Sequence, residues 1–343
     1  MGWFVSVAGV ALVLVAMGDI FTTALTLRGA GPVTGRLTAW LWRAARWVLA
    51  RPTPRPALSL AGPAIAAATV GNWLLMLWVG WTLVFLGGEG NVVSGSDGTP
   101  VDGWTKAYFA GYTLSTLGLG DVQPQGTLWQ FTTAFASVNG FVAVSMAATY
   151  LIPVVTSAAR QRQLAIYVHG LGDTPVGIIL AAWNGKDLAA LDAHLAALAP
   201  MVIDAGQQHL VYPVLYCFHG VSDATSFSVR LTALDEALLV LRHGVAPPAR
   251  PVEAVTRPLA EGVTSLLERM RAASIPPMDK APPPPDLTPL RRAGIPTVSD
   301  EEFAAIVAAH DERRRHLWAV VADAGWTWDR VFSEPEQDCL ASK

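Results

Sequence analysis

Three long apolar segments constrain the fold of this chain more than any other feature. They cover residues 3–27, 64–87 and 131–155, and each exceeds the roughly 20 residues that a helix needs to cross a bilayer. Hydrophobic residues make up 52% of the 343-residue chain and charged residues only 15%, which is too apolar for an ordinary soluble domain of this size. The sequence therefore predicts a membrane protein with three spanning helices.

The first apolar segment differs from a secretory signal. No basic residue precedes it, its apolar run is long, and no small-x-small cleavage site closes it. We therefore interpret it as a membrane helix, although Asp19 interrupts it. An ionisable group in a span is costly, and we expect Asp19 to pair with Arg28 or Arg43. Ion sensing by Asp19 is the alternative.

The distribution of basic residues predicts the direction of the spans. Six arginines lie between the first two segments, in residues 28–62, and two more follow the third. The connection over residues 88–130 instead has three acidic residues before its single lysine. The positive-inside rule then places residues 28–62 and everything after about residue 157 in the cytoplasm. Residues 88–130 and the N-terminus are expected outside, in a cell or inner membrane.

The external connection contains a short helix signal. Its first part is rich in glycine, serine and proline and predicts a loop. Residues 102–114 then predict a helix capped by Asp102. This helix is too short to cross the bilayer, so we expect a half-depth helix that returns through an extended segment. Irregular backbone at membrane depth is tolerated only inside protein or along a watery cavity. One face of the helix would hold Trp104, Ala107, Tyr108 and Gly111.

The returning segment reads TLSTLGLGD over residues 113–121. A dehydrated cation needs a cage of oxygens, and successive carbonyls face one axis only if alternate residues adopt left-handed or otherwise unusual torsions. Gly118 and Gly120 allow such torsions without a Cβ penalty. We therefore expect the carbonyls of residues 116–119 to line up, with the Thr116 hydroxyl closing the innermost cation site.

The segment TLGLGD, residues 116–121, resembles the selectivity filter of potassium-channel pore domains, whose common form is TVGYG. The order around it also matches, because an outer helix and a pore helix precede it and Pro124 and an inner helix follow. The resemblance implies K⁺ as the permeant ion and four copies of the chain, because each chain supplies one filter. The implied elements are an outer helix at 64–87, a pore helix at 102–114, a filter at 115–121 and an inner helix at 131–156.

The resemblance also assigns roles to individual residues. Leu119 replaces the usual tyrosine, as in the second filter of some two-pore-domain potassium channels, and Leu117 replaces valine or isoleucine. Gly140, twenty residues after Gly120, resembles the hinge glycine of inner helices, and close helix packing is the alternative role. The implied filter ligands are Thr116, Leu117, Gly118, Leu119 and Gly120. Asp121 is expected at the outer mouth, and the hydroxyls of Tyr108 and Tyr112 are expected to reach the filter backbone or Asp121.

The last part of the chain differs in composition and predicts an α-helical cytosolic domain of six to eight helices. Amphipathic patterns cover residues 189–206, 228–244, 252–273 and 299–325, and Ser299 and Glu302 form a capping box at the last one. The motif HGLGD, residues 169–173, is interpreted as a loop. The predicted divisions are a first transmembrane helix at 1–28, a basic linker at 29–63, a pore domain at 64–157, a helical domain at 158–280, a proline-rich linker at 281–297 and a C-terminal helical segment at 298–343.

Other function classes lack sequence support. The net charge of −3 and the absence of a basic-aromatic patch exclude a nucleic-acid partner. No nucleophile elbow, metalloprotease motif, phosphate loop or GxGxxG unit is present, so we expect neither an enzyme nor a cofactor. We expect His209 and His219 to be core residues rather than a metal or pH site. Cys217 and Cys339 are expected to be reduced thiols.

The sequence thus predicts an all-α membrane protein that forms a potassium-selective homotetrameric channel in the bilayer. The cytosolic domain would gate or assemble the channel, with a regulator and a stimulus that the sequence does not identify. The spans contain no regular ladder of arginines, so we do not expect a voltage sensor. The alternatives are a weakly selective cation channel, which Leu119 allows, a non-conducting channel-like sensor or scaffold, and a membrane-tethered enzyme.

Overall fold

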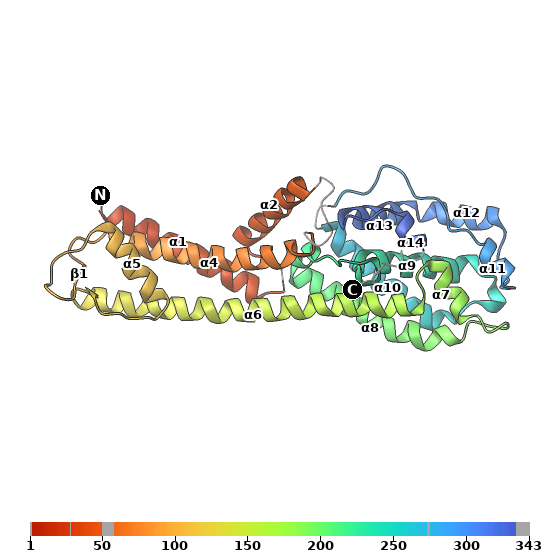
Figure 1. The fold of residues 1–343 in the computed structure, drawn as a ribbon, viewed down its shortest axis with the longest axis horizontal. Coiled ribbons are helices and arrows are strands. Elements are labelled where there is room, and N and C mark those ends of the chain that lie inside the picture. The colour runs from red at the N-terminus through yellow and green to blue at the C-terminus, as the bar shows by residue number, and fades with distance from the viewer. Residues whose placement is uncertain (1, 28, 50–57, 273–274, 334–343) are drawn as a thin grey trace, which may run out of the picture. The chain divides into compact units, whose positions relative to one another are not determined.

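The computed structural model describes residues 2–27, 29–49, 58–272 and 275–333. The chain forms two compact units, and the boundary between them falls inside one long helix (Figure 1). We call residues 1–48 and 63–155 the membrane unit, and residues 49–62 and 156–343 the C-terminal unit. Both units are built from α-helices, as expected.

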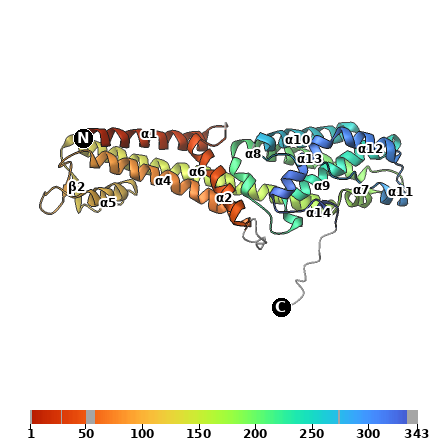
Figure 2. The same cartoon turned by 90° about the horizontal axis from the view of Figure 1, so that it is seen from above.

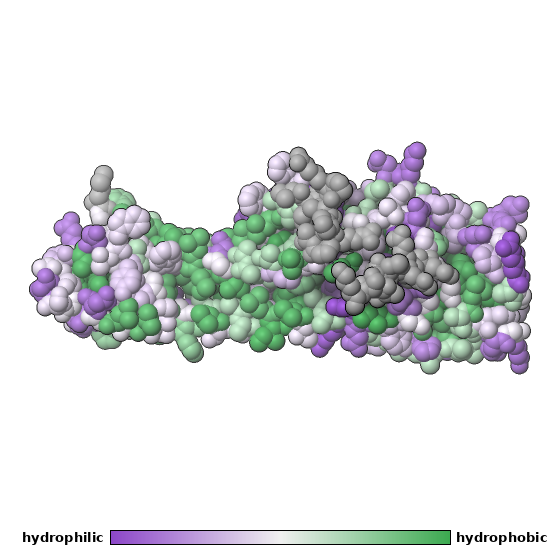
Figure 3. Space-filling model, viewed as in Figure 1, coloured by the Kyte–Doolittle hydropathy of each residue, from purple (hydrophilic) through white to green (hydrophobic). Residues whose placement is uncertain are grey.

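The membrane unit contains the three expected spanning helices. Among the described residues, three helices are long and apolar enough to cross a membrane. Hydrophobic side chains gather on the surface over these helices, as Figure 3 shows. The helices are α1 (Gly2–Leu25), α4 (Ala61–Leu86) and α6 (Thr127–Leu171); α2 (Pro32–Leu49), α5 (Gly103–Leu114), β1 (Val92–Ser94) and β2 (Val122–Pro124) complete the unit.

Small residues bring α1 and α4 close together. A Cβ added to Gly9 of α1 would lie 2.5 Å from the carbonyl oxygen of Gly80 in α4, and one on Gly80 would lie 2.7 Å from a methyl group of Val13. Membrane helices associate through such close backbone contacts, because lipid removes the hydrophobic driving force between them. The glycines of the two helices therefore explain why α1 and α4 pack side by side (Figure 2).

Asp19 has a structural role, and its predicted pairing with Arg43 is wrong. Its carboxylate accepts hydrogen bonds from the Val33 amide at 2.8 Å and from the amide and hydroxyl of Thr34. The indole Nε1 of Trp73 donates to it at 3.2 Å. Asp19 therefore caps the start of α2, where amide groups lack helical partners and the helix dipole favours an anion. The Nε of Arg43 donates instead to the carbonyl of Ala39, and Arg28 lies outside the described residues.

The helix α2 itself was not predicted. Its residues lie in the segment interpreted as a basic linker, where arginines and tryptophans alternate without a long apolar run. The capping carboxylate comes from α1, fourteen or more residues upstream in sequence. This cap depends on a tertiary contact between residues far apart in sequence, and local sequence patterns do not reveal such contacts.

The C-terminal unit is a bundle of helices around one hydrophobic core. The helices α8 and α10 pack against each other. A Cβ added to Gly206 of α8 would lie 3.6 Å from the Cα of Leu266 in α10. The helices are α7 (Pro175–Ala182), α8 (Ala190–Val211), α9 (Phe227–Leu239), α10 (Glu253–Ala272), α11 (Thr288–Arg292), α12 (Asp300–Ala309), α13 (Asp311–Asp323) and α14 (Asp329–Phe332). A π-helical turn over Val240–Gly244 extends α9, and the predicted stop at Gly244 is confirmed.

Several predicted boundaries differ from the structure. The inner helix continues to Leu171, because residues 156–171 contain no proline and Gly170 keeps helical torsions. It therefore includes His169, which was expected in a loop. The predicted helix over 299–325 breaks at His310, where φ is −102° and ψ is 6°. Ser299 caps α12 as expected, and its hydroxyl accepts from the Glu302 amide at 3.1 Å.

The proline-rich segment packs against α13 rather than acting as a free spacer. The guanidinium of Arg314 donates to the carbonyls of Pro282 and Pro283 at 2.8 and 2.7 Å. The same guanidinium forms two bonds with the carboxylate of Glu236 in α9, and both side chains are almost fully buried. Arg314 therefore connects α9, α13 and the proline segment inside the core.

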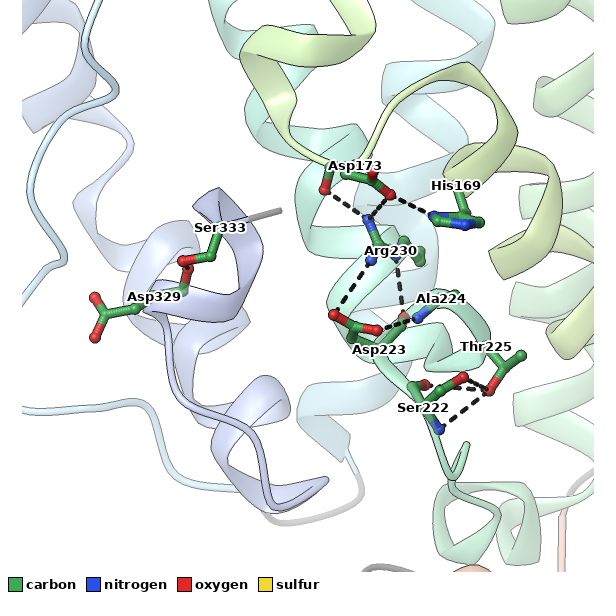
Figure 4. Close-up of polar contacts among 9 residues, drawn as sticks. All are labelled: His169, Asp173, Ser222, Asp223, Ala224, Thr225, Arg230, Asp329 and Ser333. Carbon is green, nitrogen blue, oxygen red and sulfur yellow. Dashed lines mark hydrogen bonds and ion pairs between the residues drawn. The ribbon is translucent and has the colours of Figure 1, made fainter. Parts of the chain in front are cut away.

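A second buried arginine fixes the end of α6. Figure 4 shows Arg230 of α9 between Asp173, which follows α6, and Asp223. Its NH1 donates to the Asp173 carbonyl at 2.6 Å, and its Nε donates to the Asp223 carbonyl at 3.0 Å. His169 contacts the Asp173 carboxylate through Nδ1. The HGLGD motif thus forms a helix end tied to α9.

His209 is a core residue, as predicted. It is 3% exposed, its Nδ1 lies 2.9 Å from the Ala205 carbonyl oxygen, and its ring stacks on Phe227 at 5.6 Å. Burial lowers the pKa of His209 to about 4, because the charged ring would lose its hydration there. The side chain is therefore held in its neutral form.

Candidate functional site

The short helix α5 is anchored to the membrane unit along one face. Asp102 caps it, and the carboxylate accepts from the Thr105 amide at 2.8 Å, as predicted. The indole of Trp78 in α4 donates to the Ala107 carbonyl at 2.8 Å, and the Phe85 ring packs edge-on against Phe109 at 4.9 Å. These contacts hold the C-terminal end of α5 at a fixed place beside α4.

The opposite face of α5 is exposed in the single chain. This is the face predicted to hold Trp104 and Tyr108, and these side chains are 86% and 45% exposed. The filter that follows is exposed as well, with Leu117 at 63% and Leu119 at 53%. Contiguous exposed apolar side chains mark sites of interaction with protein or membrane. This surface is therefore a candidate contact face for further copies of the chain.

The backbone of the filter alternates in handedness. Thr116 has φ = 58°, Gly118 has φ = 56° and Gly120 has φ = 80°, whereas the intervening residues have no positive φ. Alternation was expected at the glycines, because they adopt left-handed torsions without a Cβ penalty. The structure extends it to Thr116, the one non-glycine residue with positive φ among the described residues.

The torsion at Thr116 is strained and points to function. A β-branched residue at positive φ is a genuine outlier, and such strain costs roughly 1–3 kcal/mol and persists only where the surroundings impose it. Hydrogen bonds impose it here, because the amides of Thr116 and Leu117 donate to the carbonyls of Thr113 and Tyr112 at 3.0 and 2.9 Å. The end of α5 therefore sets the first left-handed residue of the filter.

Four successive carbonyls of the filter have no hydrogen-bond partner. No described residue donates to the carbonyl of Thr116, Leu117, Gly118 or Leu119. These residues are exposed in the single chain, so their carbonyls are open to a ligand. The Gly120 carbonyl differs, because the Gln123 side-chain amide donates to it at 3.3 Å. The structure thus separates Gly120 from the other implied ligands.

A two-stranded sheet holds the outer end of the filter. The strands β1 and β2 pair antiparallel, with Val93 opposite Gln123, and the Gly95 amide donates to the Asp121 carbonyl at 2.8 Å. The prediction of a loop at residues 92–94 is wrong, because the two valines there favour an extended strand and Val92 is fully buried. The sheet thus braces the segment directly after the predicted filter.

The two tyrosines of α5 lie near the predicted filter, but Tyr112 bonds just beyond it rather than to its backbone or to Asp121. The Tyr112 hydroxyl donates to the carbonyl of Val122, directly after the filter. The Tyr108 ring packs edge-on against Tyr112 at 5.1 Å, and its hydroxyl interacts with the Asp121 carboxylate. Tyr112 therefore links the last turn of α5 to the chain segment that leaves the filter.

Gly140 of α6 packs under the end of α5. A Cβ added there would lie 1.9 Å from the Leu114 carbonyl oxygen and 2.6 Å from its carbonyl carbon. Only glycine allows this approach without moving the backbone. This close packing explains why position 140 is a glycine. A hinge at Gly140 stays a prediction. A Gly140→Ala variant would disturb the filter support as well as any hinge.

Two features of the site were outside the reach of sequence reasoning. The Thr116 torsion depends on hydrogen bonds from the end of α5, and the bond from Gln123 to Gly120 depends on the turn into β2. The available signals were weak: Thr116 lies two residues before Gly118, in step with the two glycines, and Gln123 is a polar residue between a valine and a proline.

Comparison with known proteins places this site in a family. Residues 71–157, which include α5, the filter and most of the two flanking helices, match the family described as "Ion channel". A curated relative, "Uncharacterized membrane protein YdjJ" of Bacillus subtilis (strain 168), is 31% identical over 323 residues. The alignment covers 94% of this chain and 94% of YdjJ. No solved structure matches the chain.

Proposed function

This chain belongs to the ion-channel family of the two-transmembrane pore type, and from that premise we propose that it is a potassium-selective channel. Potassium ions would cross the membrane passively and move from site to site by mutual repulsion. The four carbonyls of residues 116–119, together with the Thr116 hydroxyl, would replace the water shell of the ion. The protein would need no cofactor and would catalyse no reaction.

The observation that carries this proposal is the run of unpaired carbonyls on a backbone of alternating handedness. Left-handed torsions at Thr116, Gly118 and Gly120 turn every second peptide over, so that successive carbonyls can face the same side. Carbonyls left without hydrogen bonds retain their full capacity to bind a cation. Potassium filters are built from such carbonyl rings.

A homotetramer follows from the number of oxygens that one chain supplies. A single filter offers one carbonyl per level, which cannot enclose an ion, so a closed ring needs further copies related by rotation. The exposed face of α5 and the exposed filter leucines support contacts between copies. We propose four copies, by similarity to the family whose filter the sequence resembles.

The proposed orientation places the C-terminal unit in the cytoplasm. It rests on the six arginines between the first two spans and on the positive-inside rule. The N-terminus and the β1–β2 sheet would lie outside, with Asp121 at the outer mouth. The C-terminal unit would gate or assemble the pore, because α6 runs from one unit into the other.

Recording from the purified protein in a planar bilayer tests the proposal. With equal concentrations of potassium on one side and sodium on the other, a potassium-selective channel gives a large reversal potential that is set by its potassium-to-sodium permeability ratio. A reversal potential near zero would favour the weakly selective cation channel that Leu119 allows. A protein that inserts but carries no current would favour a non-conducting sensor.

A further inference from the structure

A cavity of about 120 Å³ in the C-terminal unit has three arginines and two histidines among its ten lining residues, together with Asp235, Thr264 and three apolar residues. Its walls come from α9 and its π-helical extension, from α10 and from α13. A water molecule needs about 10–15 Å³ of such volume. The cavity therefore has room for one phosphoryl group in place of several water molecules.

Both histidines of the cavity lie at breaks in helical regularity. His243 belongs to the π-helical turn that extends α9, where the Val245 amide donates to the Val240 carbonyl at 2.9 Å. His310 lies at the break between α12 and α13. Single π-helical turns are rare and occur frequently at functional sites. The two irregularities bring the two rings to a centroid distance of 5.6 Å.

Three donors of the cavity have no acceptor among the described residues. The guanidinium of Arg242 and the ring of His243 form no hydrogen bond or ion pair there, and Nδ1 of His310 lies 3.0 Å from the Ile306 carbonyl, which leaves its Nε2 free. Arg313 differs, because its guanidinium binds both oxygens of Asp235 and the Thr264 hydroxyl. Arg242 is thus the arginine of this cavity whose charge no carboxylate offsets.

The local field at the cavity is positive. The pKa of His243 is lowered, first by burial and then by the charges of Arg242, His310 and Arg250, and no acidic group contributes to that shift. Asp235, the carboxylate that lines the cavity, is paired with Arg313, and its neighbour Glu236 is paired with Arg314. An anion entering the cavity would therefore meet one free guanidinium and two imidazoles beside a carboxylate whose charge is already offset.

We propose that this cavity binds a phosphate-class oxyanion, either free inorganic phosphate or the terminal phosphate of a small phosphorylated molecule. Arg242 forms a charge-assisted pair with the anion, since guanidinium groups match phosphate oxygens in geometry. His243 and His310, which also line the cavity, donate their free ring nitrogens. The site lies within the C-terminal unit and does not depend on whether the membrane unit conducts ions.

Titration calorimetry on the full-length protein in detergent tests the site. Inorganic phosphate and pyrophosphate are titrated at constant ionic strength, so that non-specific screening stays the same. We expect saturable binding of at least one probe and a rise in the thermal midpoint with probe concentration. Tighter binding of pyrophosphate identifies the terminal phosphate of a larger molecule as the source, and tighter binding of phosphate identifies the free anion.

Two variants and one control decide the assignment. Arg242→Gln should weaken binding at least tenfold, because it removes the positive charge that pairs with the anion. His243→Phe should weaken it severalfold, because it removes the ring donor while keeping a ring of similar size. Arg292→Gln removes an exposed arginine outside the cavity and should change the affinity less than twofold. Circular dichroism checks that each variant is folded. Failure of both probes to saturate, or equal affinity in Arg242→Gln and the parent protein, overturns the proposal.

Discussion

The membrane unit and the C-terminal unit treat their polar groups in opposite ways. In the predicted filter, four carbonyls accept no hydrogen bond from the described part of the chain. In the C-terminal unit, the buried charges of Arg314 and Glu236 are fully paired inside the chain. Under the proposed function, the first arrangement is completed by an ion and further copies, whereas the second is complete within one chain. Variants in the two units should therefore fail in different ways, by lost selectivity in one and by lost stability in the other.

The largest effect is expected at the filter. Gly118→Ala should abolish potassium-selective current, because alanine resists φ = 56° by roughly 1–2 kcal/mol and turns the peptide away from its alternating pattern. Reversal potentials and single-channel currents measure the effect. The matched control is Gly98→Ala, at φ = 68° in the loop after β1, which adds the same strain away from the filter. Equal selectivity in Gly118→Ala and the parent would contradict the filter assignment.

A large loss of stability is expected from the buried ion pair of the C-terminal unit. Arg314→Met leaves the carboxylate of Glu236 buried without its partner, and breaking such a pair costs about 3–5 kcal/mol. The thermal or denaturant midpoint of the full-length protein reports the change. Arg291→Met, which removes an exposed pair with Asp300, should change it little. A similar midpoint shift in both variants would argue against internal pairing as the source of stability.

Acid should destabilise the C-terminal unit through His209. The folded pKa of about 4 lies below the ordinary value of 6.5, so the unfolded chain binds the proton more readily. Stability is therefore full above about pH 6.5 and falls as the pH drops to about 4, by a total of about 3 kcal/mol. Unfolding measured across this window in the parent and in His209→Gln should show a smaller pH dependence in the variant. An equal slope would remove His209 as the cause.

The smallest effect is expected from a single hydroxyl beside the filter. Tyr112→Phe removes the hydrogen bond to the Val122 carbonyl, which is worth about 1 kcal/mol. We expect a severalfold lower potassium-to-sodium permeability ratio, because the outer end of the filter is held less firmly. Tyr108→Phe keeps the bond to Val122 and should have a smaller effect. A ratio unchanged in Tyr112→Phe would show that the β1–β2 sheet alone holds this end.

The elements that depend on local sequence were predictable. The three spans, the short helix capped by Asp102 and the stop at Gly244 follow from apolar length, capping and glycine signals. The missed elements depend on distant residues. The start of α2 uses the carboxylate of Asp19, and β1 needs β2 as its partner. Patterns along the chain do not contain such pairings.

The site divides along the same line. Glycine spacing predicted the left-handed torsions at Gly118 and Gly120, whereas the torsion at Thr116 comes from hydrogen bonds at the end of α5. The close contact between Gly140 and Leu114 joins residues that are 26 positions apart, so spacing from the filter indicated an important glycine without giving its packing role. Sequence therefore identified most of the residues, and the structure supplied the reasons for them.

The central claim is that main-chain oxygens of residues 116–119 from several copies replace the hydration shell of a potassium ion. The most direct test is anomalous diffraction from crystals of the assembled protein grown with thallium or rubidium in place of potassium. The account predicts a column of heavy-ion peaks on the symmetry axis, each surrounded by carbonyl oxygens of Thr116, Leu117, Gly118 and Leu119. An axis without such peaks, with these carbonyls directed away from it, would contradict the account.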